Sequence, residues 1–185
     1  MSWIETIDET EASGALREVY DRIAGDRGKV SNIMRVQSLN PEAMEAHLEL
    51  YKTIVYGNNG LSREDRELVA TAVSVTNGCE YCTNHHAVAL NAYWNDDERI
   101  DRLVDDLGAV DLTDRQRAMV DYAVELTDAP EAVDSGDIER LREAGVDDEQ
   151  ILAVALVVGY FNFVNRLAEG LGVAFSAEEM TGYEY

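Results

Sequence analysis

The chain has 185 residues, 46% of them apolar, and its 37 acidic against 15 basic residues give a net charge of -22. This length fits a single domain, 1–185, that can bury a core without a disulfide or a zinc staple. The strong negative charge argues against nucleic acid and against an anionic membrane surface as partners.

The basic residues include only two lysines, Lys29 and Lys52. An acidic, lysine-poor surface is typical of a protein that works in concentrated salt, where the screening length falls to ~3 Å. An ordinary acidic cytosolic protein is the alternative. Residues 1–11 lack the basic and apolar regions of a secretory signal, and the longest apolar run, 151–160, is too short to span a bilayer. We therefore expect a halophilic, cytoplasmic protein.

Apolar residues recur at helical spacing almost throughout the chain, and no segment alternates as a strand would. Ser62 and Thr113 begin segments that resemble helix-capping sequences. The pattern predicts an all-α protein with helices over 11–25, 41–56, 62–76, 79–94, 97–107, 113–127, 135–144 and 147–169. We expect the folded core to cover about 15–173 and the acidic end, about 176–185, to be a poorly ordered tail.

Two of these helical segments resemble each other. Residues 61–77 and 112–128 share several residues when aligned, and the shared positions recur at helical spacing. Either a weak internal repeat or two amphipathic helices of similar pattern explains the match. Glu67 in the first copy corresponds to Ala118 in the second, and only the first copy runs on into cysteines. The first copy is therefore the expected place for any chemistry.

The cysteines follow a turn signal at Asn77-Gly78. Cys79 and Cys82 are three residues apart, which puts them on one helix face with Cα atoms roughly 5 Å apart. His86 comes four residues after Cys82, so its imidazole can reach that sulfur. A helix N-terminus favours a thiolate and a basic neighbour adds to this. Two thiols beside a base are the parts of a site that handles peroxides or disulfides.

A carboxylate is expected beside this histidine. If 62–76 and 79–94 form an antiparallel hairpin, Glu67 precedes Asn77 by about as many residues as His86 follows it, so the two lie nearly level. A carboxylate there would fix the tautomer of the imidazole. The predicted catalytic site is Glu67, His86 and Cys82, with Cys79 as the thiol that traps the oxidised sulfur.

The spacing of these residues also carries a family resemblance. Glu67, eleven residues, Cys79, two residues, Cys82, three residues and His86 resembles the signature of the AhpD-like alkylhydroperoxidases of the carboxymuconolactone decarboxylase superfamily. The stretches LSREDRELVATAVSVTNGCEYCTNHHAVAL and YFNFVNRLAEGLG are similar to its subgroup of peroxidase-related enzymes. The resemblance covers about residues 15–173.

The resemblance implies an all-α homo-oligomer, a trimer or hexamer, that reduces a hydroperoxide substrate with a dithiol reductant and needs no cofactor. It matches Cys82 to the peroxidatic position, Cys79 to a more exposed resolving position, and Glu67 and His86 to a proton relay. AhpD proper commonly has a histidine just before the second cysteine. This chain has Tyr81 there, so that part of the relay is absent.

Two other functions stay open at this stage. One is a general thiol–disulfide exchanger or redox sensor on the same scaffold. The other is a non-enzymatic helical oligomer whose cysteines are vestigial or bind a metal, with a histidine and a carboxylate completing the site. The ligands in that case are Cys79, Cys82, either His85 or His86, and either Glu67 or His47.

The remaining polar residues on apolar helices receive weaker interpretations. His47 is expected to be structural, and His85 is given no catalytic role. Asn162, Asn165 and Arg166 fall on one face of the apolar helix 147–169. Buried polar groups need partners, so this face is expected to meet another subunit or an acidic residue, or to be a polar stripe at the helix edge.

Overall fold

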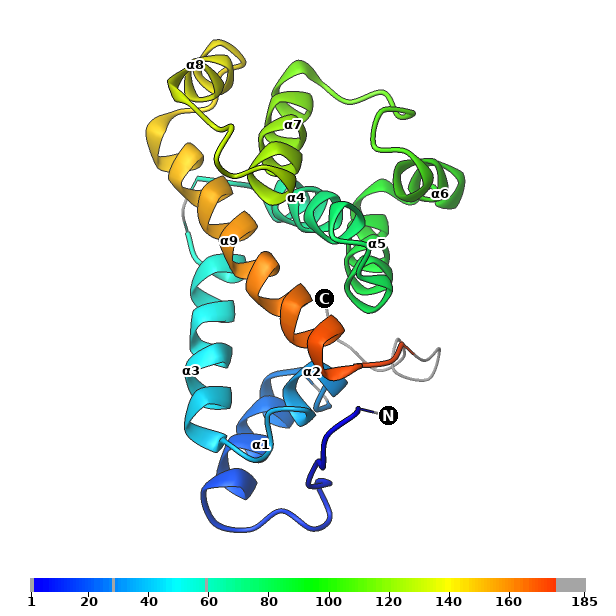
Figure 1. The fold of residues 1–185 in the computed structure, drawn as a ribbon, viewed down its shortest axis with the longest axis vertical. Helices are drawn as coiled ribbons and strands as arrows, with labels where there is room; N and C mark the ends of the chain where they lie inside the picture. Colours follow the sequence, from blue (N-terminus) through cyan, green and yellow to red (C-terminus); the bar gives the residue numbers. More distant parts are fainter. Residues whose placement is uncertain (1, 28, 59, 176–185) are drawn as a thin grey trace.

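The structure is a computed structural model that describes residues 2–27, 29–58 and 60–175, so the predicted tail at 176–185 lies outside the described residues. Within the described ranges the chain is helical and contains no strand, as predicted. The elements are α1 (Gly14–Arg27), α2 (Asn32–Arg35), α3 (Pro41–Tyr51), the π-helix η1 (Lys52–Tyr56), α4 (Arg63–Thr76), α5 (Glu80–Trp94), α6 (Asp97–Asp105), α7 (Asp114–Asp128), α8 (Ser135–Glu143) and α9 (Asp148–Leu171) (Figure 1).

Local capping explains why most helices start where the sequence predicts. Ser62 accepts a hydrogen bond from the backbone N–H of Asp65 at the start of α4, and Thr113 does the same for Gln116 at the start of α7. Asn40 caps α3 in the same way, with Pro41 as its first residue. These bonds involve only residues close in sequence, so the sequence alone can specify them.

Two features differ from the predicted helices. The short α2 was not predicted, and the last turn of the predicted helix 41–56 is the π-helix η1. Arg66 donates to the carbonyl oxygens of Val55 at 2.8 Å and Gly57 at 2.6 Å, and Arg63 donates to Val55 at 3.1 Å. The end of η1 is thus held by side chains of α4. This contact depends on tertiary packing and has no local signal.

Helix α9 runs through the middle of the molecule (Figure 1). It packs against α4, α7 and η1, and α4 packs in turn against α5 and α7. The largest cluster of buried apolar side chains joins α4, α7 and α9 and includes both cysteines. A second cluster lies among α1, α2 and α3, and a third among α4, α5, α6 and α7. The cysteines therefore lie in the core.

Helix α9 is also the one described helix that is long and apolar enough to cross a membrane by length and composition. Its longest unbroken apolar run, 151–160, is too short to predict this from the sequence. Within the fold 56% of its most apolar window is buried. The helix is apolar nearly all round because other helices cover much of it, which is the pattern of a core helix.

The polar face of α9 is hydrogen-bonded to the ends of α4 and α7. The side-chain amide of Asn77, at the end of α4, donates to the side-chain oxygens of Asn162 and Asn165, each at 3.1 Å. Asn162 also donates to Thr127 Oγ1 at 3.0 Å, and Arg166 donates to Asn162. Within the described residues these polar groups join α9 to α4 and α7, and a contact with another subunit remains a prediction.

Candidate active site

The α4–α5 hairpin turns tightly at Asn77 and Gly78. Gly78 has φ +67°, in the left-handed region that glycine adopts without strain. Cys79 is the N-cap of α5, and its sulfur accepts a hydrogen bond from the backbone N–H of Cys82 at 3.4 Å. The two sulfurs thus lie on the same side of the first turn of α5, as the three-residue spacing predicts. Both cysteines are free thiols.

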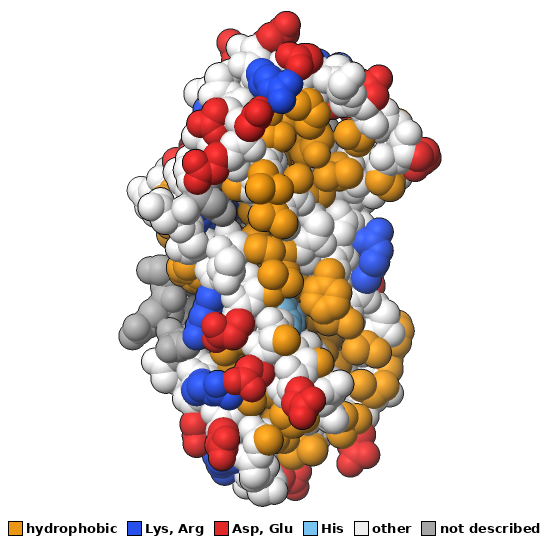
Figure 2. Space-filling model, turned by 90° about the vertical axis from the view of Figure 1, so that its left-hand side faces the viewer, with side chains coloured by type: hydrophobic (Ala, Val, Ile, Leu, Met, Phe, Trp, Pro, Cys, Tyr) orange, Lys and Arg blue, Asp and Glu red, His pale blue; other side chains and the backbone are white. Residues whose placement is uncertain are grey.

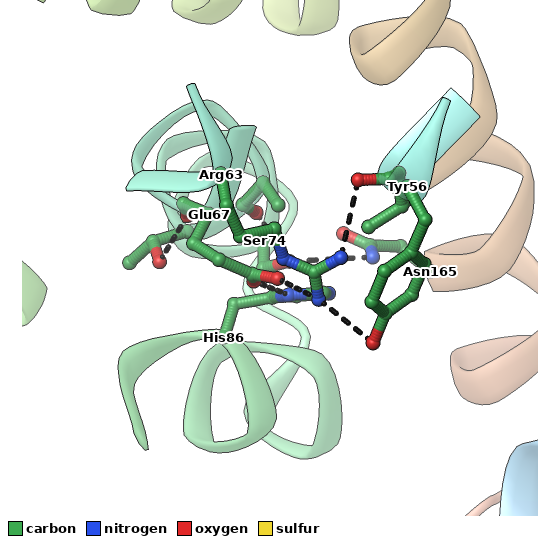
Figure 3. A network of polar contacts seen from close by, with 9 residues as sticks. Tyr56, Arg63, Glu67, Ser74, His86 and Asn165 are labelled. Atoms are coloured by element: carbon green, nitrogen blue, oxygen red, sulfur yellow. Dashed lines mark hydrogen bonds and ion pairs between the residues drawn. The ribbon is translucent and has the colours of Figure 1, made fainter. Parts of the chain in front are cut away.

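The short turn brings Glu67 of α4 beside His86 of α5. Glu67 Oε2 lies 2.8 Å from Nδ1 of His86, the contact that the hairpin geometry predicts. Its other oxygen, Oε1, lies 2.6 Å from Nη2 of Arg63. Figure 3 shows the Glu67 carboxylate between the Arg63 guanidinium and the His86 ring, with Arg63 also reaching Tyr56. Both carboxylate oxygens are therefore engaged.

The Glu67 carboxylate is ionised although its side chain is only 2% exposed. Burial by itself raises the pKa of Glu67, but the hydrogen bond and charge of His86 and the charge of Arg63 outweigh burial and lower it. An ionised carboxylate on Nδ1 holds the ring hydrogen on that nitrogen. Nε2 of His86 is then the nitrogen that can accept a proton.

Both cysteines are more buried than the resemblance implied. Cys79 is 0% and Cys82 is 2% exposed, so Cys79 is not the more exposed thiol. The surroundings of Cys82 also do not favour its thiolate. A hydrogen bond to Cys79, burial and the neighbouring Cys79 charge all raise the pKa of Cys82, and the Asn165 side chain opposes them. The physical reason is that the first turn of α5 points its sulfurs into the core.

Cys82 and His86 line one cavity of about 70 Å³. Most of the wall is aromatic or apolar, and all three histidines of the chain contribute to it. The lining residues are Ser31, Ile33, Met34, His47, Tyr51, Tyr81, Cys82, His85, His86, Tyr160, Phe161 and Val164. A small polar molecule that enters therefore meets the Cys82 sulfur and the His86 ring together.

Sequence reasoning identified the acid, the base and the thiols but missed several neighbours. Arg63 lies four residues before Glu67 on one helix face, so its ion pair had a local signal. Asn165 had only its position on an apolar helix as a signal. In the structure it is 1% exposed and lies against Ser74 and the Cys82 thiol. Tyr81, in place of the family histidine, accepts from the backbone N–H of Ile33 at 3.3 Å.

The described part of the chain contains no group of three or more His, Cys, Asp or Glu side chains placed to hold a metal ion. Among the ligands considered from the sequence, Glu67 is engaged by Arg63 and His86, and Cys79 does not line the cavity. His47 is bound to Tyr160 and Gln37. The metal-binding alternative therefore has no ligand set in these residues.

The chain is similar to known proteins in sequence family and in fold. The model of the carboxymuconolactone decarboxylase family matches residues 41–125. The chain is similar in structure to an alkylhydroperoxidase AhpD core, an uncharacterized peroxidase-related protein from Ralstonia eutropha JMP134. The two are 26% identical over 97% of this chain and 94% of that chain, with a TM-score of 0.87. No curated protein matches by sequence.

The chain is also similar to two further solved structures. An uncharacterized peroxidase-related protein from Silicibacter sp. TM1040 is 29% identical over 95% of this chain and 94% of that chain, with a TM-score of 0.83. The debrominase Bmp8 is 18% identical over 94% and 92% of the two chains, with a TM-score of 0.77. At that identity Bmp8 shares the fold alone, so the fold is compatible with more than one activity.

Proposed function

We propose, from the premise that this chain is an AhpD-like member of the carboxymuconolactone decarboxylase superfamily, that it reduces hydroperoxides with Cys82 as the attacking thiol. The observation that carries the proposal is the cavity where Cys82 and His86 meet. Behind His86, the ionised Glu67 holds Nδ1 and leaves Nε2 for the proton. A base held by a carboxylate beside a thiol is an arrangement that activates a nucleophile.

The first step transfers a proton and breaks the O–O bond. Because the pKa of Cys82 is raised, the resting group is a thiol, and the proton has to leave as the sulfur attacks. His86 takes this proton, directly or through one water in the cavity. The sulfur bonds to the terminal oxygen of R–O–O–H, and the O–O bond breaks. The products are a Cys82 sulfenic acid and an alkoxide, which takes the proton from His86 and leaves as an alcohol.

The second step forms the disulfide. Cys79 lies beside Cys82 and attacks the sulfenic sulfur, which releases the oxygen as water. A dithiol reductant then restores both thiols and is itself oxidised to a disulfide. Because Cys82 lines the cavity and Cys79 is fully buried, the reductant is expected to attack Cys82.

The same burial bears on the alternative of a general thiol–disulfide exchanger. Exchange with protein partners needs a disulfide that a bulky thiolate can approach in line. Both sulfurs are at most 2% exposed, and the cavity beside Cys82 is small. This geometry favours small oxidants and small dithiols over protein disulfides, and so favours peroxide reduction.

The test is to treat reduced, anaerobic protein with one equivalent of peroxide and follow the 79–82 peptide by mass spectrometry. The wild type is expected to lose two thiols per peroxide and form a Cys79–Cys82 disulfide. Cys79→Ser should stop at a sulfenic acid that dimedone traps, and Cys82→Ser should not react. A Cys82→Ser variant that consumes peroxide at the wild-type rate would overturn the proposal.

A homo-oligomer, a trimer or hexamer, is proposed for the working enzyme. What supports it is an exposed apolar face, and Figure 2 shows apolar side chains running along this side of the molecule. The exposed apolar side chains of α3, η1 and α9 are Leu50, Tyr56, Leu152, Leu156 and Phe163. Sedimentation velocity should show a trimer or hexamer, which the double variant Leu152→Lys, Leu156→Lys dissociates. A monomeric wild type at micromolar concentration would contradict this.

A cytoplasmic location and a high-salt environment are also proposed. They rest on the net charge of -22 and the two lysines. Carboxylates at this density repel each other at low ionic strength, and salt screens that repulsion. The unfolding midpoint of the protein should rise between 0.1 and 3 M KCl, and a midpoint that stays constant would count against the halophilic assignment.

A further inference from the structure

The cavity has a polar wall that the proposed reaction does not use. Tyr160 of α9 and His47 of α3 line the cavity together with Cys82 and His86. Nε2 of His47 and the Tyr160 hydroxyl oxygen are 2.7 Å apart, and both side chains are 5% exposed. His47 was expected to be structural from its sequence position. In the structure it binds the hydroxyl group of Tyr160, a residue that also lines the cavity.

The distances around His47 favour one direction for this hydrogen bond. The Gln37 amide nitrogen donates one hydrogen to the Ile33 carbonyl at 2.8 Å and lies 2.8 Å from Nδ1 of His47. The Gln37 oxygen is farther from Nδ1, at 3.1 Å. Since an amide nitrogen carries two hydrogens, its second one is available to Nδ1. Nδ1 is then the acceptor of this pair.

His47 is neutral at pH 7 because burial lowers its pKa to about 4. A neutral imidazole carries one ring hydrogen, and with Nδ1 accepting, this hydrogen is on Nε2. Nε2–H therefore donates to the Tyr160 oxygen. The hydrogen of the tyrosine hydroxyl then has to point away from His47. A hydroxyl that accepts one hydrogen bond also becomes a stronger donor, because bonds in a chain polarise one another.

We propose that the Tyr160 hydroxyl donates a hydrogen bond to the leaving oxygen of the hydroperoxide as the Cys82 sulfur attacks, and that His47 is its positioning residue. This inference rests on the proposed peroxidase function. It assigns a catalytic role to α9, an element that contributes neither the thiol nor the base. The physical need is clear, because negative charge that develops in an aromatic-lined cavity is poorly solvated, and a preorganised donor offsets that cost.

The step balances without consuming the tyrosine. His86 takes the Cys82 proton, the sulfur bonds to the terminal oxygen, and the O–O bond breaks. The electron pair of that bond goes to the leaving oxygen, which Tyr160 holds by its hydrogen bond. The His86 imidazolium then gives its proton to this oxygen and the alcohol leaves. Tyr160 keeps its own hydrogen, and His47 stays neutral throughout.

Tyr160→Phe tests the proposal because it removes the hydroxyl and keeps the ring. Stopped-flow rates of reduced protein are measured with tert-butyl hydroperoxide, whose leaving group is a poor one, and with peracetic acid, whose leaving group is a stable carboxylate. Iodoacetamide, which has no leaving oxygen, is the third reagent. The variant should react on the order of 100-fold more slowly than wild type with the alkyl hydroperoxide. Its rate loss with the peracid should be smaller, and its rate with iodoacetamide should be within about twofold of wild type.

Two further variants sharpen the result. In His47→Gln the rate losses should rank in the same order over the three reagents but be smaller. The hydroxyl remains in this variant but is no longer polarised by the imidazole. Tyr81→Phe is the matched control, since it removes another hydroxyl from the same cavity. Its losses should not depend on the leaving group.

The outcomes separate this inference from the proposed function. A wild type that reacts with neither peroxide overturns both. A reactive wild type with an equally reactive Tyr160→Phe overturns only the role of Tyr160. Equal losses with all three reagents indicate damage to the thiol site and also overturn it. If the rate loss depends on the leaving group in Tyr81→Phe and not in Tyr160→Phe, the hydrogen-bond donor is Tyr81, and the proposal is overturned.

Discussion

Helices α4 and α7 have similar sequence patterns, and only α4 carries the candidate site. Both begin with a hydroxyl N-cap, and both place an arginine four residues later. Arg66 donates to the carbonyls of Val55 and Gly57, and Arg117 donates to those of Leu107 and Val110. In each copy the arginine ties the helix to the preceding loop. The shared residues therefore serve folding.

The copies diverge where the site lies. Glu67 corresponds to Ala118 in the aligned segments. The helix that follows α7 carries neither a cysteine nor a histidine, and its Asp137 accepts from the backbone N–H of Asp134 at 2.7 Å in the capping box of α8. The turn between α4 and α5 is also shorter than the loop between α7 and α8. A short turn keeps two facing residues level, so we expect the site to need both the acid–base pair and the tight hairpin.

The largest expected effect comes from giving the first copy the residue of the second, Glu67→Ala. Without the carboxylate, His86 loses its orientation, and the rate of Cys82 oxidation should fall by about 100- to 1000-fold. The free energy of unfolding should also drop by ~3 kcal/mol, because Arg63 loses its buried partner. Stopped-flow peroxide kinetics and urea denaturation measure the two effects.

A matched control is available on the same helix. The Glu64 side chain accepts from Trp94 Nε1 at 2.8 Å and does not line the cavity. Glu64→Gln should leave the peroxide rate within about twofold of wild type, whereas Glu67→Gln should slow it by on the order of 100-fold. Equal rates for the two glutamine variants would show that the carboxylate at 67 does not orient the base.

The next effect compares the shared arginines. Arg66 is 5% exposed, whereas the Arg117 side chain is 30% exposed. Arg66→Ala should cost ~3 kcal/mol of unfolding free energy, because it removes two charge-assisted bonds to carbonyls that become buried without donors. Arg117→Ala should cost about 1 kcal/mol, since water can replace its bonds. Urea denaturation of both variants measures these changes. A larger loss of unfolding free energy for Arg117→Ala than for Arg66→Ala would contradict the prediction.

Acid should affect the first copy through Glu67. Its folded-state pKa is lowered from the ordinary 4.5, so its ionised form stabilises the fold. This stabilisation is fully present above about pH 4.5 and is lost as the pH falls through the lowered folded-state pKa. The difference in unfolding free energy between wild type and Glu67→Gln should therefore be constant above that pH and shrink below it. A difference that grows on acidification would reverse the assigned sign.

The smallest expected effect is that of salt on Cys82. The surface charge of -22 disfavours a thiolate, and molar KCl screens it. Alkylation of Cys82 should speed up a few-fold between 0.1 and 3 M KCl, and by the same factor in Glu67→Gln, because the buried contacts of Glu67 are not screened. Rates that stay flat or fall, while circular dichroism shows an intact fold, would exclude this surface effect.

The sequence predicted most helices because their ends depend on residues three or four positions apart. Ser62, Thr113 and Asn40 cap their helices through such local bonds. The short α2 and the π-helix η1 escaped prediction, because arginines of α4 hold the end of η1 through contacts that no periodicity encodes. The Glu67–His86 contact was predictable because a tight turn joins the two helices. Residues that are about equally far from such a turn lie opposite each other.

By itself, then, the sequence determined an all-α chain, its capped helices and an acid–base–thiol set on one hairpin. Only the tertiary structure decided how deeply the cysteines are buried and that Glu67 binds Arg63 as well as His86. It also decided that Tyr160 and His47 complete the cavity. His47 and Tyr160 are 113 residues apart in the chain. Their meeting depends on how α3 packs against α9, and packing between distant elements follows the shape of the whole core rather than the spacing of residues along any one helix.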